Sequence, residues 1–178
     1  MRSVAIARNY AEALFTLGER SGQLEAYAGL MDSVAAAVDA APEVAAVLMS
    51  PRVPKATKVR LVGNALQDAP REFVLFIQGV IRRGRQAFLG DIATAYGALV
   101  DVKFNRMRAS VIVAREPNQA LRTLIHERLT TVFRKEVLET YVISPAILGG
   151  AVVKVGDRVY DGSVRRRLAH LRRQLLAR

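Results

Sequence analysis

The 178-residue sequence contains no cysteine, no tryptophan and only two histidines, His126 and His170. Without cysteine there can be no disulfide, no thiolate metal site and no cysteine nucleophile. Two histidines are too few for a histidine-rich metal site. No apolar run approaches the roughly 20 residues that span a membrane, and charged residues interrupt the opening MRSVAIARNYAEALF, unlike the apolar core of a signal peptide. We therefore expect a soluble or peripheral protein.

The charge of the chain is large and unevenly distributed. The formal net charge is +11. Residues 1–105 carry 12 basic and 10 acidic side chains, whereas residues 106–178 carry 15 basic and 6 acidic ones. This asymmetry indicates a partner of opposite charge: an acidic protein, a nucleic acid or an anionic membrane surface. Because 51% of the residues are apolar, the composition also argues against disorder.

Apolar residues recur at helical spacing through the first 105 residues and predict six helices with short loops, which is typical of a bundle. Gly22, Pro42 and Gly84 separate some of these helices. The first helix and the fifth, at about Pro70–Arg82, are apolar around most of their circumference. Such helices need cover on most sides. Either they are central in the bundle, or they form a groove for another amphipathic helix.

The composition changes after Arg108, and we place a domain boundary near residue 105. Ala109–Ala114 and Val137–Ile143 are rich in β-branched residues and predict strands. A helix begins between them, near Asn118. The order strand, helix, strand favours a parallel pair joined by a right-handed crossover. The apolar face expected of this helix consists of Leu121, Leu124, Ile125, Leu129 and Val132.

The stretch AILGGAVVKVGDRVYDGSVRRRL, from Ala146 to Leu168, combines turn residues with a basic run. Gly149-Gly150 permits backbone angles that other residues resist. Gly156-Asp157 separates two short strands and predicts a type II′ hairpin turn. Asp161 or Ser163 then caps a last helix. The apolar stripe of this helix is Val164, Leu168, Leu171 and Leu175, and the opposite face is assigned Arg165, Arg166, Arg167, Arg172 and Arg173.

Two catalytic interpretations of this stretch fail on spacing. A phosphate-binding loop places its glycines before a helix and a Lys-Ser/Thr pair, but Gly149-Gly150 precedes a strand. A serine nucleophile requires a base and a Gly-x-Ser-x-Gly turn, and His170 lies two turns beyond Ser163 in the same helix. We therefore interpret the glycines as turns, Ser163 as a helix cap, and both histidines as surface or boundary residues. We expect no catalytic residue, cofactor or metal ion.

The arginine-rich last helix has three interpretations: a solvated face, a nucleic-acid-binding surface, or a docking surface for an acidic protein. Nucleic-acid binding requires exposed aromatic residues among the basic ones, or a recognition motif. The aromatic residues of this half, Phe133, Tyr141 and Tyr160, lie in or beside apolar runs and are expected to face the core. Docking to an acidic protein is therefore the favoured functional interpretation.

The segment LGGAVVKVGDRVYDGSVRRRLAHLRRQL resembles the C-terminal signature of the delta subunit of F-type ATP synthase, called the oligomycin-sensitivity-conferring protein in mitochondria. The opening ARNYAEALF is similar to the Ala-Arg-x-Tyr-Ala-x-Ala of that family. RRGR at Arg82–Arg85 is similar to its Asn-Gly-Arg or Lys-Gly-Arg element, although Arg83 stands where the family often has Asn. The resemblance covers essentially the whole chain. The residues matching the C-terminal signature are Gly149, Gly150, Gly156, Asp157, Asp161, Gly162, Ser163, Val164, Arg167 and Leu168.

The resemblance implies a mostly α fold, with a six-helix bundle in residues 1–105 and a small α/β domain in residues 106–178 that has a β-hairpin and a C-terminal helix. It implies a non-catalytic stator subunit, one copy per complex, which resists rotary torque during proton-driven ATP synthesis. The expected location is the cytoplasmic side of a bacterial plasma membrane, peripheral through the complex. The alternative is a basic nucleic-acid-binding protein that uses the arginine-rich helix.

The resemblance also implies two partners. The N-terminal domain would hold the N-terminal helix of an alpha subunit through its first and fifth helices, and the C-terminal domain would contact the b subunits of the peripheral stalk. The stalk contact is assigned to Arg165, Arg166, Arg172 and Arg173. The alpha-helix contact is assigned to Ala7, Tyr10, Ala11, Leu14, Phe73, Phe76, Ile77 and Val80.

Overall fold

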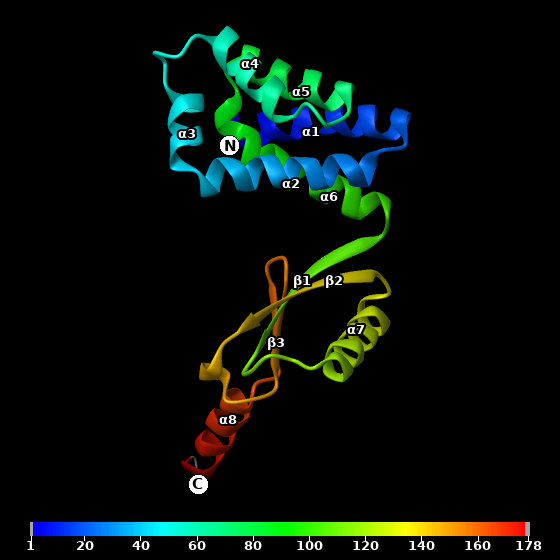
Figure 1. Ribbon diagram of the computed structural model, residues 1–178. Coiled ribbons are helices and arrows are strands. Elements are labelled where there is room, and N and C mark those ends of the chain that lie inside the picture. Colours follow the sequence, from blue (N-terminus) through cyan, green and yellow to red (C-terminus); the bar gives the residue numbers. More distant parts are fainter. Residues whose placement is uncertain (1, 177–178) are drawn as a thin grey trace. The chain divides into compact units, whose positions relative to one another are not determined.

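The computed structural model describes residues 2–176 (Figure 1). The chain is mostly helical, with a four-stranded sheet in its C-terminal part. It divides into two compact units, unit 1 (Met1–Val100) and unit 2 (Asp101–Arg178). This division lies close to the change of composition near residue 105.

Unit 1 is built from helices joined by short loops (Figure 1). Gly22 and Gly84 follow α1 and α5 with positive φ angles of 66° and 69°, which glycine adopts at little cost. The sixth helix expected from the sequence begins with a 3₁₀ turn, η1. The elements are α1 (Arg2–Ser21), α2 (Leu24–Ala40), α3 (Pro42–Met49), α4 (Lys55–Ala65), α5 (Arg71–Arg82), η1 (Gln86–Phe88) and α6 (Leu89–Lys103).

Large apolar side chains from these helices share one core. The rings of Tyr27 and Phe73 lie 5.5 Å apart in its centre. The buried Tyr96 hydroxyl donates a 3.0 Å hydrogen bond to the carbonyl oxygen of Leu24. Burial raises the pKa of Tyr96 to about 12, with a further contribution from Tyr27. Gly18 makes this packing possible, because a Cβ atom there would lie 2.9 Å from the Tyr96 hydroxyl oxygen.

Unit 2 is a sheet with the strand order β2-β1-β3-β4. β1 and β2 are parallel, as the strand-helix-strand pattern predicts, whereas β1–β3 and β3–β4 are antiparallel. Gly156 has a φ of 53° in the β3–β4 turn, in the left-handed region that the predicted hairpin requires at its first position. The elements are β1 (Arg106–Val113), α7 (Gln119–Phe133), β2 (Glu136–Ile143), η2 (Pro145–Ile147), β3 (Ala151–Val155), β4 (Arg158–Asp161) and α8 (Val164–Leu176).

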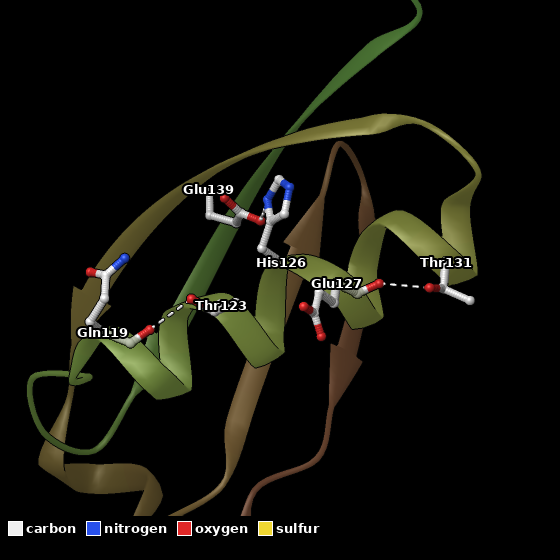
Figure 2. Close-up of polar contacts among 6 residues, drawn as sticks. All are labelled: Gln119, Thr123, His126, Glu127, Thr131 and Glu139. Carbon is white, nitrogen blue, oxygen red and sulfur yellow. Dashed lines mark hydrogen bonds and ion pairs between the residues drawn. The ribbon is translucent and has the colours of Figure 1, made fainter.

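Polar contacts attach α7 to β2 (Figure 2). His126 Nδ1 lies 2.8 Å from Glu139 Oε1, and the Arg122 guanidinium lies 5.0 Å from the centre of the Tyr141 ring. Within α7, the Thr123 hydroxyl donates to the carbonyl oxygen four residues earlier (Figure 2). The half-buried residues of α7 include Arg122 and Thr130 as well as Ile125 and Leu129. The buried face is therefore rotated away from the purely apolar one, and three residues expected on that face are exposed: Leu121, Leu124 and Val132.

Candidate functional site

Most residues assigned from the sequence to a groove on α1 and α5 are core residues. Six of the eight expose 2% of their surface or less and cannot touch a partner in this conformation: Ala7, Ala11, Leu14, Phe73, Ile77 and Val80. The assignment of these six to a docking surface is therefore wrong. The wide apolar arcs of α1 and α5 are explained mainly by central positions inside unit 1, the first of the two interpretations that the sequence left open.

Tyr10 and Phe76 are different, because both are only half-buried. Their rings meet edge-on, with centroids 6.3 Å apart, where α1 contacts α5. Two residues near Phe76 extend this surface. Leu75 is 51% exposed, and Gly79 lies one turn after Phe76 on the same side of α5. A Cβ atom at Gly79 would meet no heavy atom within 4 Å, so the surface is open at this point.

The glycines of the C-terminal signature form turns in the structure. A Cβ atom at Gly150, whose φ is 76°, would lie 2.5 Å from the carbonyl oxygen of Gly162. At Gly149 it would lie 3.2 Å from Cγ2 of Val164. The loop after η2 and the start of α8 therefore pack backbone to backbone, which residues with side chains would prevent. The two glycines therefore fix the start of α8 to the loop after η2, where the N–H of Val164 also donates to the carbonyl oxygen of Gly149.

Both residues proposed as the cap of α8 take part in it. The backbone N–H of Ser163 donates to Asp161 Oδ1 at 2.9 Å, and the Ser163 hydroxyl oxygen accepts from the N–H of Arg166 at 3.2 Å. Ser163 is buried, with 3% of its surface exposed. Hydrogen bonds from Ser163 hold the pKa of Asp161 below its ordinary value, and the charges of Arg166 and Arg165 add to this effect. Ser163 is therefore a helix cap, as predicted.

The apolar stripe of α8 is uncovered. Every residue of this helix is exposed, and Leu168, Leu171 and Leu175 expose 53%, 53% and 76% of their surfaces. With Val164 they follow a 4-3-4 spacing, which is the seam of a coiled coil. An amphipathic helix that exposes its leucines to water is a candidate docking surface for another helix. We call these four residues the α8 stripe.

The arginines of α8 do not all lie opposite the stripe. At 3.6 residues per turn, Arg165, Arg167 and Arg172 flank it, whereas Arg166 and Arg173 lie on the far side. Flanking positions of this kind set partner choice through charge. Arg167 was not among the stalk-contact residues assigned from the sequence. The helical spacing of the α8 stripe could have identified Arg167, because that spacing places it beside the stripe.

Within residues 2–176, His, Asp and Glu side chains do not gather in any group of three that could hold a metal ion. His126 is paired with Glu139, and His170 is exposed on α8. Tyr160, expected in the core, is 45% exposed, with its ring 5.6 Å from that of Phe133. In the described part of the chain, no helix has the length and hydropathy to cross a bilayer.

The family model described as the ATP synthase delta (OSCP) subunit matches residues 6–175. The chain belongs to this family. It is 38% identical over 172 residues to ATP synthase subunit delta of Gemmatimonas aurantiaca, covering 96% of this chain and 93% of the relative. It is 35% identical over 175 residues to the same subunit of Anaeromyxobacter sp. (strain Fw109-5), covering 96% and 97%.

The fold is also similar to that of a chain in a solved structure. A chain in the cryo-EM structure of the Toxoplasma gondii mitochondrial ATP synthase hexamer matches with a TM-score of 0.73 and 21% identity. The match covers 97% of this chain and 98% of that one. The family model and the two relatives confirm the resemblance to the delta family over nearly the whole chain, and the comparisons give no support to a nucleic-acid-binding protein.

Proposed function

We propose that this delta-family chain is the non-catalytic stator subunit that links the catalytic head of an ATP synthase to its peripheral stalk. The observation that carries this proposal is that each compact unit has its own exposed, largely apolar helical surface. In unit 1 this surface surrounds Tyr10, Phe76 and Gly79. In unit 2 it is the α8 stripe. A subunit that links two components needs a separate contact surface for each of them.

The head contact is assigned to α1 and α5. The N-terminal helix of an alpha subunit lies along these helices, with an apolar face on Tyr10, Phe76 and Leu75. Gly79 leaves room for the backbone of the visiting helix to approach. Such helix-in-groove docking depends on a few apolar anchors spaced at three and four residues. We treat α1–α6 as one six-helix bundle that holds this surface rigid.

The stalk contact is assigned to α8. Its partner is an end segment of a b subunit that lays its own apolar seam on Leu168 and Leu171. Arg165, Arg167 and Arg172 would then face acidic side chains on both flanks of the partner. Opposite charges at such positions speed encounter and fix register more than they add affinity.

The mechanism is mechanical. Torque generated by rotation inside the head turns the head itself unless a stator restrains it. Because the two contact surfaces are on one chain, binding of the first partner raises the local concentration of the second partner to about millimolar. Two interfaces of modest strength then hold together. One copy of the chain is enough, on the cytoplasmic side of a bacterial plasma membrane and attached to it only through the complex.

The test is whether the full chain bridges two partners that do not bind each other. Purified catalytic head and the soluble part of the b subunits are mixed with and without the chain and separated by size. We expect all components to co-elute only when the chain is present. A chain that binds the head, or the b subunits, but never both at once would overturn the proposal.

A further inference from the structure

Unit 1 contains a half-open cavity of about 300 Å³ lined mainly by α2, α3 and α4. Its floor is formed by Leu48, Ile77 and Leu89, all of which are buried. Its mouth includes Ala37 and Ala65, both exposed. The cavity shares no lining residue with the surface around Tyr10 and Phe76 or with α8, so it does not depend on the proposed function.

The walls between floor and mouth are half-buried aliphatic side chains, among them Val34, Val38 and Leu66. The one hydroxyl in the lining belongs to Ser33 and already donates a 2.8 Å hydrogen bond to the carbonyl oxygen of Gly29. A charged or strongly polar occupant would lose its water without gaining partners. The lining therefore selects an uncharged, apolar occupant.

The volume restricts the occupant further. Interiors normally pack to the density of organic crystals, and unfilled apolar space lowers stability. About 300 Å³ lies at the lower limit of small-molecule sites, which range from roughly 300 to 1,000 Å³. It exceeds the volume of any one amino-acid side chain, so a partner protein could not fill it by inserting a single anchor. A compact small molecule fits it.

We propose that this cavity is a binding site for an uncharged, largely apolar small molecule. The molecule enters between Ala37 and Ala65 and contacts α2, α3 and α4 together. α3 is short, and Leu48 is its buried residue. A ligand resting on Leu48 therefore fastens α3 to its two neighbours and raises the stability of unit 1, because it binds only the folded state.

Decan-1-ol and toluene serve as probes, titrated into the full chain carrying ¹³C-labelled Val and Leu methyl groups. We expect saturable shifts in the methyl resonances of Val34, Val38, Leu48 and Leu66 with at least one probe. We also expect a higher melting temperature for the first unfolding transition. Failure of both probes to give saturable shifts at these four residues overturns the proposal. So does a response centred on Leu171 and Leu175, which would indicate unspecific adsorption on the α8 stripe.

The matched variants are Ala37→Phe and Ala36→Phe, adjacent exposed positions of α2 of which only residue 37 lines the cavity. Ala37→Phe should weaken probe binding at least tenfold, whereas Ala36→Phe should leave it unchanged. Ala65→Phe blocks the mouth from α4 and provides the same test if Ala37→Phe does not fold. Equal loss in the cavity variant and in Ala36→Phe would show that the probes bind elsewhere.

Discussion

The ring of Tyr10 on α1 meets the ring of Phe76 on α5 edge-on, with centroids 6.3 Å apart. Each ring keeps part of its surface exposed, whereas the neighbouring Ala11 and Ile77 are sealed in the core. The two rings therefore lie at the boundary between the core of unit 1 and its surface. A helix that docks on unit 1 through α1 and α5 must rest on these two rings.

Filling the space at Gly79 should block the head contact without harming the fold. Gly79→Leu adds a side chain where a Cβ atom meets nothing within 4 Å, and it replaces glycine by a better helix former. We expect the affinity for a peptide of the alpha-subunit N-terminal helix to fall at least about tenfold, or about 1.4 kcal/mol. Fluorescence anisotropy of the labelled peptide with the full chain measures this.

Gly29→Leu is the control for this substitution. Gly29 is an exposed glycine inside α2, and a Cβ atom there also meets nothing within 4 Å. The melting temperature of both variants should be at least as high as that of the parent chain. If Gly29→Leu weakened the peptide as much as Gly79→Leu, the docking surface would not lie on α5.

Charge reversal on α8 should act by position and not by net charge. Arg172 flanks the α8 stripe and Arg173 lies opposite it, so Arg172→Glu and Arg173→Glu change the charge of the chain equally. We expect Arg172→Glu to weaken binding to the b subunits at least about tenfold more than Arg173→Glu does. The difference should shrink at about 0.5 M salt, where charges are screened beyond about 4 Å. If both substitutions weakened binding equally, the attraction would come from the overall positive charge of unit 2 and not from the positions that flank the α8 stripe.

Periodicity in the sequence predicted most helices and strands, but it did not predict which other elements pack against their apolar faces. The strand at Ala151–Val155, the Gly-Asp hairpin and the cap at Ser163 follow from local rules, because turns and caps depend on neighbouring residues. Ala7 and Ile77 show where such rules stop. An apolar position on a wide arc can face the core or a partner, and only the arrangement of the other helices decides between them.

The same limit explains α8 and α7. Leu171 was identified as part of an apolar stripe, but the sequence could not show that Leu168, Leu171 and Leu175 would all stay more than half exposed. In α7, His126 lies 2.8 Å from Glu139 of β2, whereas Leu124, expected on the apolar face, is 51% exposed. A pairing between a helix and a strand thirteen residues apart is tertiary information, which helical spacing alone does not contain.

The two glycines of unit 2 with positive φ should respond differently to alanine. Gly150→Ala brings Cβ to 2.5 Å from the Gly162 carbonyl oxygen, whereas Gly156→Ala meets nothing within 4 Å. Both pay about 1–2 kcal/mol for the left-handed conformation. We expect Gly150→Ala to lower the free energy of unfolding of unit 2 by about 2 kcal/mol more than Gly156→Ala, as rigid overpacking does. Urea denaturation followed by circular dichroism measures both, and equal losses would contradict the close approach.

Tyr96 should make the stability of unit 1 fall at high pH. Its pKa is raised from 10.0 to about 12 in the folded state, so the unfolded chain loses this proton first as the pH rises. The contribution of the neutral hydroxyl is therefore complete below pH 10 and is lost between pH 10 and about 12. In Tyr96→Phe this slope should flatten, although the variant starts less stable because the carbonyl oxygen of Leu24 loses its donor. Denaturation midpoints of both proteins across this pH range provide the measurement. Parallel slopes would show that the Tyr96 hydroxyl is in contact with water and not sealed in the core.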